Sequence, residues 1–342
     1  MSARASIIPV FVPHLGCPHA CVFCNQRRIS GAEKPATAET VRDAVRRAEV
    51  IPHEGSRELA FYGGSFTAIP AAQQIELLSA AKEALDAGLI RSIRLSTRPD
   101  AIDETVLQRL RGYGVETVEL GAQSMDDEVL RASHRGHTAG DVFRAAAMVK
   151  EAGFRLILQM MTGLPGDSPG KCVETARRLI KCRPDGVRIY PTVIVKDTEL
   201  CERWLAGEYR EHTVEDAVRI CARIVPLFER AGIPVIRLGL NPTEELSGGA
   251  AVAGAYHPAL GELVKSRILC NKVEALLEGI KPGSKVILEV HPSRISQMTG
   301  QHRQNIRALT ERFALSELSV RAGDGAADEI RLIVDSDSTK KK

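Results

Sequence analysis

Residues 7–24 read IIPVFVPHLGCPHACVFC, a short apolar run followed closely by three cysteines. Cys17, Cys21 and Cys24 have the spacing C-x3-C-x2-C, which lets three thiolates converge on three corners of a cubic iron–sulfur cluster. Electron-transfer ferredoxins mostly use four cysteines and so fill every corner. Three ligands leave one iron open, and an open iron is a place where a further molecule can bind and be activated. The stretch therefore predicts a reactive cluster on the loop after a first strand.

A zinc site and three structural thiols are the alternatives for this loop. Zinc usually takes four ligands, commonly as two pairs, and His14 and His19 are near enough in the sequence to complete a set. Phe23, directly before Cys24, is an aromatic ring that can shield a cluster from water. The loop favours a cluster over zinc. The other cysteines contain no C-x-x-C pair, which predicts small buried hydrophobic residues rather than a second cluster (Cys172, Cys182, Cys201, Cys221 and Cys270).

The composition is that of a globular protein with a full core. Of the 342 residues, 44% are hydrophobic and 26% are charged. We find no run near the ~20 apolar residues of a membrane span, and the short apolar run before Pro13 predicts no signal peptide. We therefore expect a cytoplasmic protein without a membrane partner, in surroundings that keep thiols reduced. A net charge of +3 is too weak to indicate nucleic acid by itself.

Short β-branched or apolar runs alternate with longer helical patterns along the chain. Ala71–Ala87 and Val214–Ala231 carry apolar residues at three- and four-residue spacing, which predicts helices. Repeated strand–helix units of this length predict a parallel sheet with helices outside it. The predicted strands are Ile7–Val12, Glu58–Tyr62, Ser92–Ser96, Glu116–Leu120, Arg155–Met161, Val187–Tyr190 and Pro234–Leu238.

Most of these strands end in loops rich in glycine, proline or polar residues, such as Gly63-Gly64-Ser65 and Thr97-Arg98-Pro99. In a barrel of parallel strands the carboxyl ends form one face, where ligand chemistry gathers. The predicted fold is α/β, a partial or full (β/α) barrel with a small C-terminal α+β appendage. The loops place its site at that one face.

The pattern changes after Leu240. We expect a barrel core over residues 1–240, a connector over 241–280, a small α+β domain over 281–337 and a disordered tail over 338–342. Residues 241–254 are rich in small side chains and glycine, which predicts a mobile loop. A helix with Leu263 and Val264 should follow. In the small domain we predict strands at Lys285–Val290, Leu318–Arg321 and Glu329–Val334, with one helix over Gln301–Phe313.

The arrangement C-x3-C-x-aromatic-C after a first strand resembles the signature of the radical S-adenosylmethionine (SAM) superfamily. The resemblance implies a 4Fe–4S cluster held by Cys17, Cys21 and Cys24, whose open iron is chelated by the amino and carboxylate groups of SAM. It further implies that one electron cleaves the sulfonium bond and yields a 5′-deoxyadenosyl radical, which abstracts hydrogen from a substrate. The cofactor carries the difficult step, while the protein positions it and excludes water.

The residues at the strand ends also resemble positions that contact SAM in this superfamily. By themselves, two glycines at a strand end are more often a turn, and each polar residue more often a surface charge or a strand-end hydrogen bond. Glutamine after the fourth strand and arginine twelve residues later match oxygen-independent coproporphyrinogen oxidases, where they contact the ribose and the SAM carboxylate. The expected SAM-binding residues are Gly63, Gly64, Ser65, Ser96, Arg98, Gln123, Arg135 and Gln159.

Three longer segments resemble the radical SAM half of the Elongator catalytic subunit, a tRNA wobble-uridine modifying enzyme. They are Thr97–Asp100, Val118–Thr138 and Arg188–Thr192 with its downstream Trp204 and Tyr209. Ser96 stands where that branch has glutamate, so one polar contact to SAM is absent or replaced. The segment after Leu240 is too short for an acetyltransferase domain, and it resembles instead the small C-terminal domain of stand-alone bacterial relatives. Carboxymethylation from acetyl-CoA is therefore not carried over.

The resemblance implies a radical SAM enzyme that modifies RNA, with tRNA as partner and a reductant such as flavodoxin or ferredoxin. A radical SAM enzyme acting on a small molecule or tetrapyrrole is one alternative. A non-catalytic iron–sulfur or zinc protein that binds RNA is another. Tyr256 and His257 are candidates for proton transfer or substrate contact, although a turn with a partly buried tyrosine is the favoured explanation.

Basic residues are frequent between Lys265 and Arg312, and three of them lie within two turns of the predicted helix (His302, Arg303 and Arg307). Such a face can meet a phosphate backbone, or it can simply be solvated. The oligomeric state does not follow from the sequence.

Overall fold

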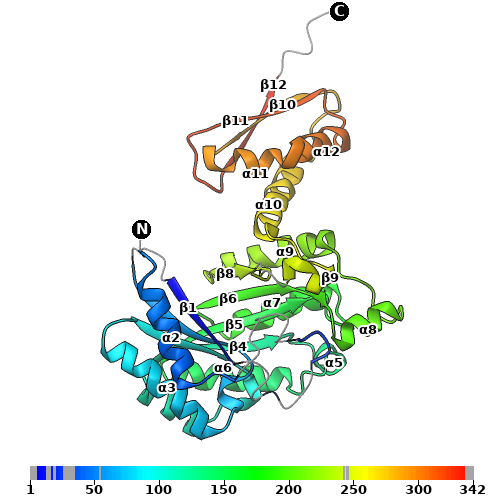
Figure 1. Cartoon of the computed structure of the whole chain (residues 1–342). Coiled ribbons are helices and arrows are strands. Elements are labelled where there is room, and N and C mark those ends of the chain that lie inside the picture. Colours follow the sequence, from blue (N-terminus) through cyan, green and yellow to red (C-terminus); the bar gives the residue numbers. More distant parts are fainter. Residues whose placement is uncertain are drawn as a thin grey trace, which may run out of the picture. The chain divides into compact units, whose positions relative to one another are not determined.

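The computed structural model describes residues 6–12, 17, 21–25, 35–53, 55–241, 243 and 246–335. His14 and His19, and the predicted tail over 338–342, lie outside them. The chain divides into two compact units (Figure 1). The barrel unit comprises residues 1–220 and 224–258, and the C-terminal unit comprises 221–223 and 259–342. The separate folding of residues 281–337 stays a prediction. In the described part, none of the helices has the length and apolar character needed to span a bilayer.

A seven-stranded parallel sheet organises the barrel unit, with its strands in the order β1-β2-β3-β4-β5-β6-β8. Its two edge strands, β1 and β8, each pair with one neighbour in the described part of the chain, so the sheet is an open, partial barrel. All seven predicted strands are confirmed, with ends that coincide or shift by at most three residues. They are β1 (Ser6–Val12), β2 (Arg57–Gly63), β3 (Ser92–Thr97), β4 (Val115–Gln123), β5 (Arg155–Thr162), β6 (Gly186–Pro191) and β8 (Val235–Leu238).

Helices connect the successive strands, as strand–helix crossovers require. Most begin at a residue whose side chain accepts a hydrogen bond from the first turn, for example Thr37, Thr138 and Thr213, each in a capping box. The helices are α2 (Ala38–Glu49), α3 (Ala71–Asp86), α4 (Glu104–Gly112), α5 (Asp127–Ala132), α6 (Ala139–Glu151), α7 (Pro169–Lys181), α8 (Glu199–Leu205) and α9 (Val214–Arg230). One-turn 3-10 helices follow β2 (Phe66–Ala68) and β3 (Pro99–Ala101).

The two faces of the sheet differ in chemistry because side chains alternate along each strand. On β3, Ile93 and Leu95 are fully buried in the hydrophobic core, while Arg94 and Ser96 point to the other face. On β4 the alternation places Val118 and Leu120 in the core and Glu119 opposite. One face therefore packs on helices, and the other carries polar side chains that meet across neighbouring strands.

The segment predicted as a mobile loop over residues 241–254 is not loop throughout, because residues 246–254 form regular structure, while its mobility stays a prediction. Leu246–Ala250 forms a π-helical turn and β9 (Ala251–Gly254) pairs antiparallel with β7 (Val193–Val195). Gly254 has φ +90°, and a Cβ there would lie 2.8 Å from the Thr192 carbonyl oxygen. The small side chains that suggested mobility are what lets the two backbones approach closely.

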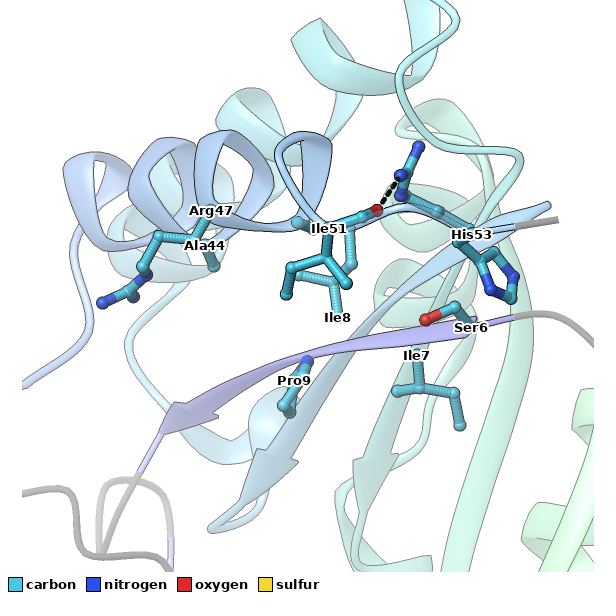
Figure 2. A pocket seen from close by; sticks show the side chains of 10 residues that line it. Ser6, Ile7, Ile8, Pro9, Ala44, Arg47, Ile51 and His53 are labelled. Carbon is cyan, nitrogen blue, oxygen red and sulfur yellow. Dashed lines mark hydrogen bonds between the residues drawn. The ribbon is translucent and has the colours of Figure 1, made fainter. Parts of the chain in front are cut away.

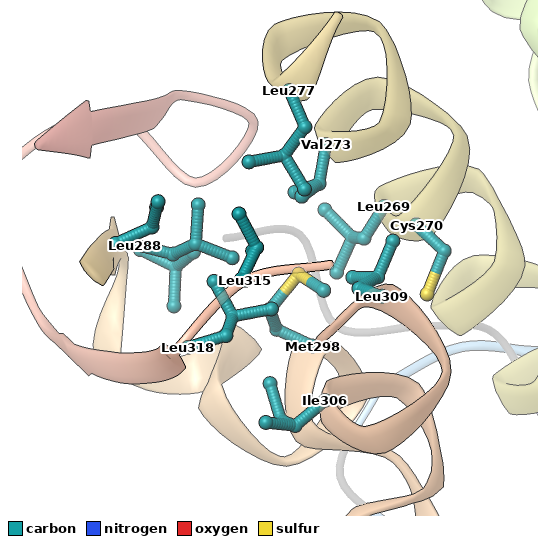
Figure 3. Close-up of a cluster of buried hydrophobic side chains, with 12 residues drawn as sticks. Leu269, Cys270, Val273, Leu277, Leu288, Met298, Ile306, Leu309, Leu315 and Leu318 are labelled. Carbon is teal, nitrogen blue, oxygen red and sulfur yellow. The ribbon is translucent and has the colours of Figure 1, made fainter. Parts of the chain in front are cut away.

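The C-terminal unit is α+β. Its three-stranded sheet has the order β11-β10-β12, with β10 parallel to β11 and antiparallel to β12. The strands are β10 (Lys285–Val290), β11 (Glu317–Ala322) and β12 (Ile330–Asp335), and the helices are α10 (Leu260–Leu277), α11 (Ile295–Thr299) and α12 (Gln304–Arg312), with a 3-10 turn at Pro292–Arg294. Buried side chains of α10, α11 and α12 pack on the sheet around Met298 and Leu288 (Figure 3).

The helix predicted over Gln301–Phe313 begins later than expected. Residues 301–303 form a 3-10 turn in which His302 and Arg303 have positive φ, so α12 starts at Gln304. His302 and Arg303 therefore lie before the helix, not on it.

Candidate active site

The cysteine loop follows β1 and is anchored by the residue between its last two thiols. Val22 is 1% exposed and packs with Ile194 and Leu200. Its backbone N–H donates to the Ser133 carbonyl at 3.3 Å, and its carbonyl accepts from the N–H of Leu200 at 2.7 Å. A turn closes between Cys21 and Cys24, whose N–H donates to the Cys21 carbonyl at 3.0 Å. The anchor holds the loop against the start of α8 and the end of α5.

The thiol side of the loop faces positive charge. The Nη1 of Arg135 lies 3.4 Å from the Sγ of Cys21, within hydrogen-bond reach for sulfur. Around Cys17, desolvation and the neighbouring Cys21 raise the thiol pKa, while the Ser65 backbone N–H, Arg135 and Arg98 lower it, and the net direction is up. Two thiols and two guanidinium groups are thus close enough to interact. The two guanidinium groups therefore counteract, but do not overcome, the effect of burial on the Cys17 thiol.

Phe23 lies between two apolar clusters, packed against residues that include Leu164 and Met161 on one side and Leu200 on the other. This position agrees with an apolar shield next to Cys24. In the described part of the chain no three His, Cys, Asp or Glu side chains are grouped around a single metal ion.

The glycine segment closes β2 against the end of β1. Gly63 has φ +104°, and a Cβ there would lie 3.2 Å from the Val12 carbonyl oxygen. The N–H of Gly64 donates to that same carbonyl at 2.8 Å. Ser65 is 1% exposed, and its Oγ lies 2.9 Å from the Oγ1 of Thr97 and accepts from the N–H of Arg98 at 3.0 Å. The glycines therefore bring the ends of β1, β2 and β3 together.

Arg98 and Arg135 are joined at the carboxyl ends of β3 and β4. Arg98 forms a two-point pair with the Asp100 carboxylate, at 2.9 Å for both contacts, and donates to the Arg135 carbonyl at 2.5 Å. Arg135 donates from Nη2 to the Gly121 carbonyl at 2.6 Å. Both arginines are buried, and the Nη1 of Arg98 and the Nε of Arg135 have no hydrogen-bond partner in the described residues. Each arginine thus keeps one donor for a further group.

Gln123 and Gln159 meet at the same edge. The Nε2 of Gln159 donates to the Oε1 of Gln123 at 3.3 Å. Gln123 ends β4 with φ +63°, a left-handed conformation that is uncommon outside glycine and asparagine. A Cβ on Gly121 would lie 2.9 Å from the Gln123 amide and 3.1 Å from Arg135, so a larger residue there would make the ends of these two side chains shift. The strained Gln123 turns its side chain toward its neighbours at this edge.

The predicted residues separate into three groups. Cys21, Arg135, Arg98 and Ser65 form one chain of contacts, with Cys17 near it and the glutamine pair adjoining it through Gly121. Ser96 is half-buried and donates instead to Glu119 at 3.4 Å, inside the sheet. Tyr256 is hydrogen-bonded to Ser247 at 2.8 Å and packs with the β7–β9 ribbon. The catalytic roles of Tyr256 and His257 stay predictions.

The sequence reasoning missed a buried charge network on the polar face of the sheet. Glu119, 1% exposed, pairs with Arg94 at 2.8 Å and with Arg188 at 3.0 Å, and Arg94 also pairs with Glu58. Tyr62 accepts from Arg188 at 2.8 Å. Charged residues inside apolar strands were the available signal, because a buried charge requires a partner.

The network fixes the charge states of its members. Burial lowers the pKa of Arg188, but Glu119, Tyr190 and Tyr62 together outweigh burial, so the pKa is raised. Burial and then Glu119 raise the pKa of Tyr62, against the influence of Arg188. Arg94 and Arg188 therefore stay charged, and Tyr62 stays protonated, on the polar face of the sheet.

One hollow in the barrel unit lies elsewhere. It measures about 270 Å³ and adjoins Ser6 and Arg57, the first residues of β1 and β2, with Ile51 and His53 on its rim (Figure 2). The thiols and arginines lie past the opposite ends of these strands. This hollow is therefore separate from the candidate site.

Two family models match the chain. The model of the radical SAM superfamily matches residues 11–179, and that of the radical SAM C-terminal domain matches residues 184–269. Among curated proteins, the chain is 26% identical to the tRNA uridine(34) acetyltransferase of Dehalococcoides mccartyi over 71% of its length and 62% of the relative. It is 29% identical to Elongator complex protein 3 of Saccharomyces cerevisiae over 66% of its length and 49% of the relative.

The chain thus spans about half to three fifths of the length of these relatives. Among solved structures, Elp3 of the archaeon Methanocaldococcus infernus, with an N-terminal deletion, matches with a TM-score of 0.64 at 21% identity. The match covers 84% of this chain and 71% of that one, and it shows a shared fold.

Proposed function

The chain belongs to the radical SAM superfamily, in its Elongator-like branch, and we propose that it is an enzyme that modifies tRNA by radical chemistry. A 4Fe–4S cluster and SAM, when bound, supply a 5′-deoxyadenosyl radical that abstracts hydrogen from the substrate. The proposal rests on the contact of Arg135 with both the cysteine loop and the end of β4. That contact joins the cluster-binding loop to the strand ends in one site.

Cys17, Cys21 and Cys24 are the proposed cluster ligands. Burial raises the pKa of the Cys17 thiol, and Arg135 and Arg98 offset only part of that rise, so iron binding has to displace the thiol proton. The Val22 anchor holds the part of the loop that carries Cys21 and Cys24, whereas the three thiols are not grouped for a metal in this structure and must converge when a cluster binds. Phe23, packed on apolar neighbours, keeps water from one side.

SAM is proposed to bind across the ends of β2 to β5. Gly63 and Gly64 let a ligand lie against the backbone, and Ser65 holds their loop to β3. The free Nη1 of Arg98 and Nε of Arg135 suit a carboxylate, for which charge-assisted hydrogen bonds are strong. Gln123 and Gln159 offer amide groups for ribose hydroxyls.

Ser96 lies one layer deeper, hydrogen-bonded to Glu119. The glutamate that the Elongator branch carries at position 96 is therefore replaced here by a serine linked to a glutamate of the next strand. We propose that Glu119 supplies the missing carboxylate to this part of the site.

The substrate is proposed to be tRNA because relatives of this chain are named as a tRNA uridine(34) acetyltransferase and as Elongator complex protein 3. The electron is proposed to come from a reductant such as flavodoxin or ferredoxin, and the cytoplasm is the proposed location. An acetyl transfer is not part of the proposal.

The test is anaerobic turnover of the reconstituted full chain with SAM and dithionite, with and without total tRNA. We expect 5′-deoxyadenosine to form, and faster with tRNA. Replacing Cys17, Cys21 or Cys24 with alanine should abolish its formation. Arg135→Ala should weaken SAM binding by about 1–3 kcal/mol, as for a lost charge-assisted hydrogen bond. Arg144→Ala, an exposed α6 arginine paired only with Asp141 among the described residues, is the matched control.

Two results would contradict the proposal in separate ways. Zinc without acid-labile sulfide after anaerobic purification would exclude radical SAM chemistry. Deoxyadenosine formation that no RNA accelerates would instead point to a small molecule or tetrapyrrole. Nucleosides from cells with and without the protein would then identify the modified base.

A further inference from the structure

The C-terminal unit has a simple connectivity around its central strand. β10 leads into α11 and then α12, and α12 leads into β11, which pairs parallel with β10. Two short helices thus connect two neighbouring parallel strands, and residues 300–303 (Gly-Gln-His-Arg) join the helices. We name residues 300–303 the GQHR loop. KH modules hold a nucleic-acid backbone at a G-x-x-G loop between two helices. Similarity of fold alone does not establish function, so an RNA contact has to be argued from the basic side chains near this loop.

The backbone of the GQHR loop is strained and exposed. Gly300 has φ +73°, and a Cβ there would lie 2.7 Å from the Asn305 side chain. His302 (φ +49°) and Arg303 (φ +60°) are also left-handed, although neither is glycine. Each such residue costs on the order of 1–2 kcal/mol. The loop is therefore less stable than it would be with glycine at position 303, which adopts this φ without strain, and it exposes an arginine there instead.

Most cations of the C-terminal unit are already engaged. Three of its arginines form ion pairs with nearby carboxylates: Arg267 and Arg312 with Glu274, and Arg321 with Glu289. Arg294 donates to a carbonyl and an amide oxygen. The other engaged cations are Lys265, Lys272, Lys285 and Arg331.

Arg303 and Arg307 differ from these. Within the described residues 260–335, no carboxylate lies within 4 Å of either guanidinium group, and neither donates a side-chain hydrogen bond. His302 beside them is likewise without a partner in this range. Glu311, one turn after Arg307 on α12, forms no ion pair with it. Lys281, in the loop before β10, is a further cation without an ion pair among the residues that the structure describes.

The packing of α12 directs these cations to solvent. Ile306 and Leu309 are buried in the cluster with Met298 and Leu318 (Figure 3). Arg307 lies outside that buried stripe and is exposed, and so are His302 and Arg303 just before the helix. Three unpaired basic side chains therefore lie within six residues on one accessible stretch.

We infer that the GQHR loop, together with Arg307, binds the phosphate backbone of single-stranded RNA. Guanidinium groups without carboxylate partners gain most from phosphate, which they can hold with two hydrogen bonds. An open loop between helices can follow a backbone, and single-stranded loops are where RNA bases are accessible for modification. The inference rests on the proposed function, since it assigns the RNA contact of the same enzyme to this unit.

The test is binding of a fluorescent single-stranded RNA of mixed sequence to the full chain, by anisotropy, over a range of salt concentrations. The variant is Arg303→Gln with Arg307→Gln. Its matched control is Arg321→Gln with Arg331→Gln, which removes the same charge from ion-paired, exposed positions in the same unit. Neither SAM nor a reductant is present, and RNA-independent deoxyadenosine formation is measured separately.

We expect the first variant to bind RNA about tenfold more weakly, with the slope of log K against log salt reduced by about 1.4, as for two lost phosphate contacts. The control should bind as the unchanged chain does, and both variants should keep RNA-independent SAM cleavage. Equal RNA binding by the two variants overturns the inference and leaves the proposed function standing. Absence of RNA binding by the unchanged chain also overturns it, whereas loss of SAM cleavage in the unchanged chain counts against the proposed function alone.

Discussion

Replacing Glu119 with glutamine should destabilise the barrel unit strongly. The carboxylate is 1% exposed and pairs with Arg94 and Arg188 at 2.8 and 3.0 Å. Glutamine keeps the shape but removes the negative charge. Arg94 would retain Glu58, whereas Arg188 would lose its carboxylate partner and keep, among the described residues, two tyrosine hydroxyls and a neutral amide oxygen. Breaking a buried pair from one side costs about 3–5 kcal/mol, and the pairing left to Arg94 puts the expected loss at about 3 kcal/mol.

The assay is urea unfolding of the apo chain, followed by circular dichroism, with the barrel-unit transition fitted separately because two units need not unfold together. Glu116→Gln on the same strand is the control, because Glu116 is exposed and forms no ion pair in the described part of the chain. It should change stability by no more than about 0.5 kcal/mol. Adding Arg188→Gln to Glu119→Gln should cost less than the two single changes together.

Two outcomes would refute this reasoning. If the Glu119→Gln chain is as stable as the control, the charge network makes no net contribution to the free energy of unfolding. A double variant whose loss equals the sum of the single losses would mean that the charges of Glu119 and Arg188 are not coupled.

Three further predictions concern single positions. Gly63→Ala should lower thermal stability and iron retention together, because φ +104° and the Val12 carbonyl at 3.2 Å both oppose a Cβ; unchanged melting would contradict this. His137 has its pKa lowered to about 4 by burial and Arg135, so folding disfavours its protonation. The contribution of neutral His137 to the free energy of unfolding should be complete above pH 6.5, the ordinary pKa of histidine. It should fall by about 3 kcal/mol as the pH drops from 6.5 to 4. In His137→Gln the free energy of unfolding should change less between pH 6.5 and 4. The same pH dependence in both proteins would contradict this role of His137. Arg303→Gly should raise the melting temperature while weakening RNA binding about threefold, since glycine relaxes φ +60°; a rise in both would show that the strain serves no RNA contact.

The strands could be predicted because each is a short apolar run with its own alternation. Ser92–Thr97 is an example, in which core-facing Ile93 and Leu95 alternate with polar neighbours. The polar members of that alternation were not recognised as a network. Arg94 and Glu119 lie 25 residues apart in sequence, and only the register between β3 and β4 brings them together.

The errors arose where backbone conformation, rather than hydrophobic pattern, decides the structure. The β7–β9 ribbon depends on a close approach at Gly254, and small residues gave no sign of a strand. The start of α12 depends on the left-handed residues His302 and Arg303, whose sequence resembles a helix. Positive φ at a residue other than glycine leaves no local signal, because tertiary contacts impose it.

The sequence by itself determined that a three-cysteine loop follows a first strand, and that parallel strand–helix units follow it, since both are local patterns of residue type and spacing. Only the tertiary structure decided that Arg135 reaches Cys21 from 114 residues away, and that Arg98 and Arg135 each keep one buried donor without a partner among the described residues. The physical reason is that a parallel sheet collects the carboxyl ends of distant strands at one edge, where burial then decides which charges are paired and which stay available.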